Sequence, residues 1–156
     1  MRVRLAVVLA LVTLAYGAPP VGAADPPHGM FTPDAIKWGD APPSLPKGSK
    51  LAVLYGDPSK DGLLVIRAKL PVNYRIPAHS HPTDEIVTVL SGTLMFGMGD
   101  KLVPAKAKPF PAGSLIVAPA KTNHSVLTKQ PVVIEVSAME PLQFIHVNPA
   151  DDPSKK

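Results

Sequence analysis

The 156-residue sequence contains no cysteine. Disulfide bonds therefore cannot stabilise the protein, and its hydrophobic core has to do so alone. A chain of this length is long enough to form one such core. We therefore expect a single domain.

Aromatic residues are scarce, at 5% of the sequence, and basic residues form no cluster. Arg2 and Arg4 contribute 2 of the formal net charge of +4, which leaves about +2 for the chain beyond the N-terminal segment. Proteins that bind nucleic acids usually gather basic side chains on one face. The sequence therefore indicates no nucleic-acid partner.

Long hydrophobic runs are missing after the first residues. The one such run, at 5–15, follows Arg2 and Arg4 and precedes small residues around Ala23. This arrangement is typical of a secretory signal peptide, which we place at 1–24. We expect a secreted or periplasmic protein with no membrane contact after cleavage. An uncleaved N-terminal anchor is the alternative.

Helix-length periodicity is also missing. Beyond residue 50, short β-prone runs alternate with Gly, Pro, Asn and Asp, as at 63–70, 85–90, 132–137 and 142–147. Many short strands at close spacing are typical of an all-β sandwich or barrel. We interpret 101–109, which is rich in Pro and Lys, as a surface loop.

These patterns divide the chain into four parts. The signal peptide is followed by an arm rich in Pro and Gly at 25–48, which is either ordered or a mobile lead-in. The β-barrel is expected at 49–149, and a frayed tail at 150–156.

The residues with the clearest chemistry are His79, His81 and Glu85. Side chains two positions apart on a strand point to the same face, so the two imidazoles can aim at one point. Pro82 ends the strand, and Glu85 opens the next apolar run, from which its carboxylate can reach back toward the rings. Two imidazoles and a carboxylate on a rigid frame are typical of a metal site.

The chain contains two motifs, His79-x-His81-x3-Glu85-x6-Gly92 and Gly113-x5-Pro119-x-Lys121-x2-His124. They resemble those of the cupin superfamily, in its small secreted single-domain (monocupin) form. The chain departs from the family pattern at Asn73 and Lys121, where glycine is usual, and at Thr128, where asparagine is usual. Asn tolerates tight turns almost as glycine does.

The resemblance implies a double-stranded β-helix, the jelly-roll barrel of cupins. It also implies that His79, His81, Glu85 and His124 bind one divalent transition metal ion. Imidazole and carboxylate ligands suit Fe, Mn, Ni, Cu, Co and Zn, and the sequence does not distinguish among them. The alternative is a barrel that keeps these residues as a polar network.

The ligand set is similar to that of dioxygenase and oxidase cupins. The resemblance thus implies a metal-dependent oxidoreductase acting on a small organic molecule, in which Glu85 could also act as a catalytic base. A non-catalytic ligand-binding, metal-binding or sensor protein is an alternative, and so is a metal-dependent isomerase or hydrolase. The two-sided apolar strands allow a homodimer.

Other polar and aromatic residues receive less specific interpretations. We expect Trp38 to attach the arm to the barrel, His28 to be solvated, His146 to be a core or surface residue, Lys121 to be a solvated loop lysine and Asp84 to belong to a turn. By strand parity with Glu85 and His124, we expect Val87, Val89 and Val126 to line the cavity of the barrel.

Overall fold

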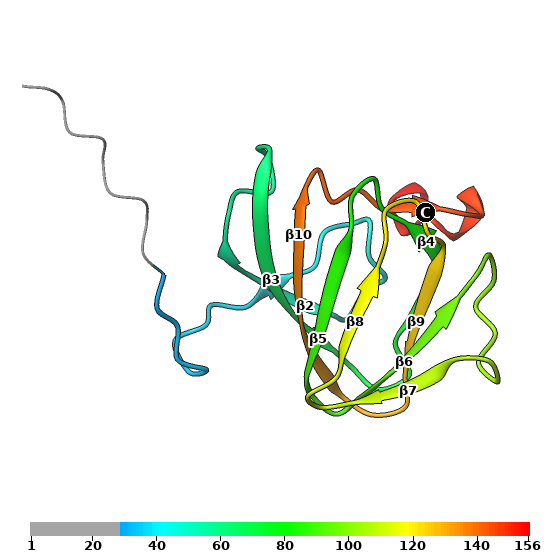
Figure 1. The fold of residues 1–156 in the computed structure, drawn as a ribbon, viewed down its shortest axis with the longest axis horizontal. Helices are drawn as coiled ribbons and strands as arrows, with labels where there is room; N and C mark the ends of the chain where they lie inside the picture. Colours follow the sequence, from blue (N-terminus) through cyan, green and yellow to red (C-terminus); the bar gives the residue numbers. More distant parts are fainter. Residues whose placement is uncertain (1–28) are drawn as a thin grey trace, which may run out of the picture.

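The fold consists of two antiparallel sheets that face each other, as the computed structural model shows for residues 29–156 (Figure 1). One sheet has six strands in the order β1-β2-β3-β10-β5-β8, and the other has five in the order β11-β4-β9-β6-β7. The strands are β1 Gly39–Asp40, β2 Lys50–Tyr55, β3 Gly62–Leu70, β4 Arg75–Ser80, β5 Glu85–Ser91, β6 Thr93–Met98, β7 Lys108–Pro111, β8 Leu115–Ala118, β9 His124–Thr128, β10 Val132–Glu140 and β11 Ile145–His146. The predicted all-β class is confirmed.

Alternating burial shows why these segments form strands. In β10, Val132, Ile134 and Val136 are buried, whereas the residues between them are half-buried. In β5, Glu85 and Val87 face inward while Ile86 is 40% exposed. A period of two places one face of each strand against the core and leaves the other face toward solvent.

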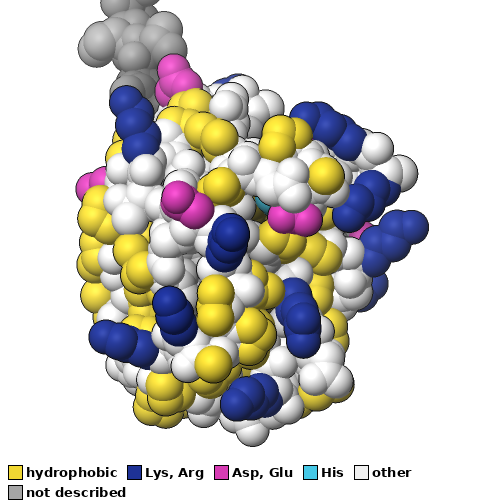
Figure 2. Space-filling view, turned by 90° about the vertical axis from the view of Figure 1, so that its right-hand side faces the viewer, with side chains coloured by type: hydrophobic (Ala, Val, Ile, Leu, Met, Phe, Trp, Pro, Cys, Tyr) yellow, Lys and Arg dark blue, Asp and Glu magenta, His cyan; other side chains and the backbone are white. Residues whose placement is uncertain are grey.

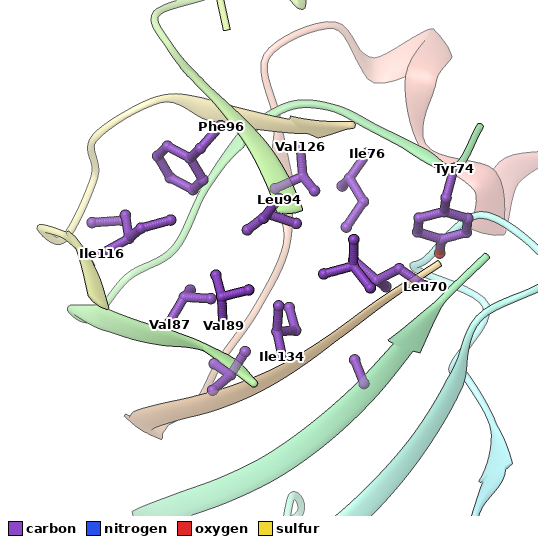
Figure 3. Close-up of a cluster of buried hydrophobic side chains, with 14 of the residues drawn as sticks. Leu70, Tyr74, Ile76, Val87, Val89, Leu94, Phe96, Ile116, Val126 and Ile134 are labelled. Atoms are coloured by element: carbon purple, nitrogen blue, oxygen red, sulfur yellow. The ribbon is translucent and has the colours of Figure 1, made fainter. Parts of the chain in front are cut away.

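The core lies between the two sheets. Its largest fully buried hydrophobic side chains are Leu94, Val89 and Val132. Side chains from both sheets, among them Phe96, Val126 and Ile134, point into this shared interior, as Figure 3 shows. A closed double-sheet core of this kind replaces the disulfide bonds that the sequence lacks.

The N-terminal arm is ordered over its described part and joins the barrel. β1 extends the six-stranded sheet by pairing with β2, and Ile36 and Leu45 are buried. The hydroxyl of Tyr74 donates a hydrogen bond to the carbonyl of Pro46 at 2.6 Å and lies 2.8 Å from the hydroxyl of Ser49. These contacts hold the end of the arm against the barrel.

Gly92 illustrates a turn that only glycine can form. Its φ is +77°, and a Cβ atom placed there would lie 2.5 Å from the carbonyl oxygen of Pro131. Both the left-handed backbone and this close approach exclude side chains. The reversal between β5 and β6 therefore takes place as the first motif predicts.

Three boundaries differ from the predictions. The predicted loop at 101–109 ends early, because Lys108 and Pro109 pair with β6 as part of β7. The predicted strand at 142–147 is reduced to β11, because the amide of Leu142 donates to the carboxylate of Glu140 in a turn.

The predicted frayed tail instead forms two 3-10 turns, η1 Pro149–Asp151 and η2 Pro153–Lys155. Asn148 and Asp152 cap these turns by accepting hydrogen bonds from backbone amides two residues on. Residues 29–156 include no helix of the length and hydrophobicity needed to cross a bilayer. The predicted signal peptide lies outside the described residues.

Candidate metal centre

Three histidines from neighbouring strand ends meet inside the barrel. His79 in β4 is the cross-strand partner of His124 in β9, and His81 directly follows β4. The ring centroid of His79 lies 4.3 Å from that of His124 and 5.0 Å from that of His81. The exposed fractions are only 1–2%. The structure thus brings together the three histidines that the two motifs predict.

A bulge in β4 aims His79 into the barrel. Ile76 pairs with Val126 and His79 pairs with His124, so β4 has one more residue than β9 between these pairs. Regular alternation would send side chains three positions apart to opposite faces, yet Ile76 and His79 both line the cavity. The extra residue changes the parity of the strand. Pro77 within the strand was the available sequence signal.

Each of the three rings is oriented by a hydrogen bond from Nδ1 to a backbone carbonyl. The acceptors are the carbonyls of Pro77 for His79 at 2.7 Å, of Gln143 for His81 at 2.8 Å and of Thr122 for His124 at 3.0 Å. A carbonyl oxygen can only accept, so Nδ1 carries the proton and Nε2 offers a lone pair. Backbone carbonyls often fix metal-binding histidines in this tautomer.

Burial keeps two of these imidazoles neutral. Desolvation, together with the neighbouring His124 and His81, lowers the pKa of His79 to about 2, while the hydrogen bond to Pro77 acts in the opposite direction. Burial also lowers the pKa of His81, although the nearby Glu85 acts in the opposite direction. A neutral imidazole with a free Nε2 is the form that binds metals.

Glu85 reaches the same centre from the opposite sheet. It is the first residue of β5 and is 8% exposed. Its Oε2 lies 3.3 Å from Nε2 of His124 and 3.8 Å from Nε2 of His81. A carboxylate oxygen therefore faces two nitrogen lone pairs, and groups that can only accept need a cation or a proton between them.

The three histidines fit a metal ion. Their ligand atoms lie within 4.8 Å of one another. Nε2 of His81 is buried and has no hydrogen-bond partner within the described part of the chain. A buried polar atom without a partner is costly, and a metal ion would satisfy it together with the other two nitrogens.

Two of the three departures from the cupin motifs occupy left-handed turns. Asn73 has φ +60° and Lys121 has φ +61°, both in the region that glycine adopts most easily. The amide of Lys121 donates a hydrogen bond of 2.8 Å to the carbonyl of His81. Lys121 thus connects the turn before His124 to the residue after β4, while its side chain is exposed, as predicted.

The remaining polar and aromatic predictions are largely confirmed. Asp84 is exposed in the turn before Glu85 and accepts a hydrogen bond from the amide of Ala120. Trp38 attaches the arm to β3, since the Nζ of Lys69 lies 4.1 Å from the centroid of its ring. His146 is half-buried next to His79, with both ring nitrogens unpartnered among residues 29–156. His28 lies outside the described residues.

The histidines open onto a cavity of about 730 Å³ inside the barrel. His79, Glu85 and His124 form part of its wall. Val87 and Val126 line it as predicted, whereas Val89 is buried in the core and is not part of the wall. This volume is typical of sites for small organic molecules.

The sequence interpretation missed the contribution of the C-terminal segment. Phe144 packs against the rings of His79 and His81, with centroid distances of 4.9 and 4.8 Å, and it lines the cavity. The carbonyl of Gln143 orients His81. The alternation of Phe144 with His146 was the only signal, and it did not show which strand these residues would join.

From outside, the centre is almost completely covered. On the face in Figure 2, histidine is visible only as a small area beside acidic and hydrophobic side chains. A buried centre in a largely apolar cavity strengthens electrostatic interactions and limits access of water.

Comparisons with known proteins agree with the fold. The cupin domain family model matches residues 66–137. No curated protein matches the sequence. Among solved structures, the polyketide cyclase RemF from Streptomyces resistomycificus is similar over 82% of this chain and 91% of its own, with 18% identity and a TM-score of 0.64.

Two further structures share the fold. An RmlC-like cupin from Shewanella frigidimarina NCIMB 400 has 14% identity and a TM-score of 0.57, over 73% of this chain and 91% of its own. KdgF from Halomonas sp. has 20% identity and a TM-score of 0.54, over 70% of this chain and 93% of its own. Identities this low support the fold alone. The match to the family model identifies residues 66–137 as a cupin domain.

Proposed function

We propose that this cupin is a metal-dependent enzyme that oxidises a small, largely apolar organic molecule with dioxygen. The observation that carries the proposal is the position of the buried, Nδ1-protonated histidines at the wall of a cavity of about 730 Å³. Bound metal would supply Lewis acidity and, for a redox-active ion, electron transfer beside the substrate.

The residues of the chain have separate parts in this proposal. His79, His81 and His124 would hold the ion through Nε2, and the carbonyls of Pro77, Gln143 and Thr122 keep the rings in place. Glu85 would be the fourth ligand and would offset part of the charge of the ion.

Glu85 is also the group best placed to accept a proton from a substrate. Its Oε2 lies in the centre, and its side chain lines the cavity. The apolar wall around it, including Val87 and Phe96, excludes water from the site. A carboxylate in such surroundings can act as a general base, because few other groups compete for the proton.

A non-catalytic ligand-binding protein is the second candidate. Apart from the metal-centre residues, Glu140 is the only polar residue that strands β2–β10 contribute to the cavity wall in the described chain. Enzymes usually need several polar groups to orient a substrate. A wall this apolar suits simple capture of a hydrophobic molecule.

Oxygen uptake separates the candidates. Protein loaded with Fe(II), Mn(II), Ni(II), Cu(II) or Zn(II) is screened against small apolar molecules, with Glu85→Gln as the variant that removes the base. We expect substrate-dependent uptake with a redox-active metal and a loss of at least about 100-fold in Glu85→Gln. Equal turnover of a molecule by the zinc form would indicate an isomerase or hydrolase. Binding without turnover by any form would support the second candidate.

Export and self-association also belong to the proposal. The signal peptide predicts a secreted or periplasmic protein, and N-terminal sequencing of the mature protein would locate the cleavage site. A homodimer is compatible with the outer face of the six-stranded sheet, where Ile86, Leu115 and Val117 are 40%, 60% and 53% exposed. Sedimentation equilibrium would measure the association.

A further inference from the structure

The charged side chains around the cavity all have the same sign. Asp40, Glu85, Glu140 and Asp152 line it, and no lysine or arginine of the described residues does. The wall therefore offers no lysine or arginine charge to an anionic molecule.

Two of these acids have lysine partners outside the wall. Asp40 pairs with Lys50 at 2.6 Å, and both side chains are largely exposed. Asp152 lies 3.5 Å from Lys155 and also accepts hydrogen bonds from Ser154. Such pairs at the surface contribute little energy and are screened by salt. They reduce the negative field at this part of the wall without reversing it.

Glu140 is the acid whose charge is least compensated. It is half-buried at the end of β10, and its Oε2 accepts a hydrogen bond from the amide of Leu142. Within the described part of the chain it has no lysine, arginine or histidine within 4.0 Å. Glu85 differs, because a metal ion would offset its charge.

An anion that enters this cavity meets two unfavourable effects. It loses hydration in a wall made mostly of aliphatic and aromatic side chains, such as Leu94, Phe96 and Phe144. It also approaches the like charges of the buried Glu85 and the half-buried Glu140, which water and salt screen less than those of exposed acids. An uncharged apolar molecule meets neither effect and gains from burial of its surface.

We infer that the cavity accepts uncharged, largely apolar small molecules and discriminates against organic anions of the same size, with Glu140 as a specificity-determining residue beside the metal-centre acid Glu85. This inference rests on the proposed function in taking the cavity as the substrate site. It narrows the substrate class to molecules such as alcohols, ketones or hydrocarbons with an aromatic or alicyclic body, and it excludes carboxylates.

Three ligands on one scaffold test the charge selection: 1-naphthylmethanol, 1-naphthylmethylamine and 1-naphthoate. Each is titrated by calorimetry into the full chain after treatment with a chelator, so that no metal can bind the carboxylate. We expect the alcohol to bind, the amine to bind at least as tightly, and naphthoate to bind at least about tenfold more weakly than the alcohol. Equal binding of naphthoate and the alcohol would overturn the inference, as would no binding by any of the three.

Glu140→Gln tests the assigned residue. Glutamine retains an oxygen that can accept from the amide of Leu142, so the turn after β10 is preserved. We expect the preference for the alcohol over naphthoate to shrink at least about threefold. Asp100→Asn is the matched control, since it removes one acid that does not line the cavity, and its preference should equal that of the wild type. An unchanged preference in Glu140→Gln would contradict the assignment.

The results of these titrations do not depend on whether the chain binds metal. Because they use metal-free protein, a failure of the chain to bind metal leaves their outcome interpretable. Conversely, tight binding of naphthoate to metal-free protein would overturn the charge selection and leave the metal assignment intact.

Discussion

The cavity wall has two parts that are built in different ways. On the histidine side, His79, His81 and Glu85 come from one short stretch of sequence, and His124 joins them through cross-strand pairing with His79. In the rest of the wall, Asp40 in β1 and Asp152 in the C-terminal segment come from distant parts of the sequence. Local spacing and strand register determine the positions of the histidines and Glu85. The positions of Asp40 and Asp152 depend instead on how the N-terminal arm and the C-terminal segment pack against the barrel.

The two parts of the wall also differ in rigidity. The histidine rings are fixed by three hydrogen bonds to carbonyls, one of them that of Pro77 within β4. The arm is held by a two-residue strand, a few buried side chains and the hydroxyl of Tyr74. We therefore expect substitutions on the histidine side to change metal affinity, and substitutions in the arm to change stability and cavity closure.

The largest expected effect is on the histidine side. His81→Ala removes a buried ligand nitrogen, and we expect metal affinity to fall at least about 100-fold in a competition titration with a chelating dye. His146→Ala is the matched control, since His146 lies outside the group of three ligands, and its affinity should stay within about threefold of the wild type. Wild-type affinity in His81→Ala would show that the side chain is not a ligand.

Leu45→Ala tests the arm through its packing. Leu45 is 8% exposed and lines the cavity, so truncation should lower the free energy of unfolding by about 2–3 kcal/mol. Metal affinity should not change. Met30→Ala serves as the control in the same arm: Met30 is 93% exposed, and its truncation should change stability by less than about 0.5 kcal/mol. A large drop in metal affinity in Leu45→Ala would mean that the two parts of the wall are coupled.

Tyr74→Phe tests the arm through a single hydroxyl. Its loss leaves the carbonyl of Pro46 and the hydroxyl of Ser49 without this partner, at a cost of about 1–2 kcal/mol in stability. Hydrogen exchange should accelerate in the arm near Ser49 more than in β4 and β9. Tyr55→Phe is the control, because Tyr55 is 46% exposed and should be nearly neutral. Uniform acceleration across the barrel would contradict a separately held arm.

The smallest expected effect concerns Lys121, in the turn that leads to His124. Glycine removes the cost of its left-handed backbone, so Lys121→Gly should raise the free energy of unfolding by about 0.5–1 kcal/mol. Lys129→Gly, at a position without positive φ, should instead leave stability equal or lower it by up to about 1 kcal/mol. Denaturant titration measures both, and destabilisation by Lys121→Gly would show that its side chain makes a contribution of its own.

The same contrast explains how far the sequence could be interpreted. Alternation with a period of two and turn residues such as Gly92 predict the strands, because each signal is local. The spacing of His79, His81 and Glu85 predicts their meeting, because a strand and one turn determine it. His124 required the cupin resemblance, since its register against β4 arises from pairing across the sheet.

Long-range features escaped prediction for a physical reason. The bulge at Pro77 changes strand parity, and periodicity alone cannot show which residue is extra. The positions of Phe144 and Gln143 against His79 and His81 depend on a short strand stabilised by tertiary contacts. The presence of Asp40 and Asp152 in the cavity wall also depends on tertiary packing, because the segments that contain them have no regular hydrophobic period.

Metal content tests the central claim most directly. Elemental analysis of the full chain purified from its native compartment should give about one divalent transition metal ion per chain. A variant that combines His79→Ala with His124→Ala should contain almost none while keeping its β-sheet circular dichroism spectrum. Negligible metal in the wild type, or equal metal content in the variant, would contradict a metal centre at these histidines.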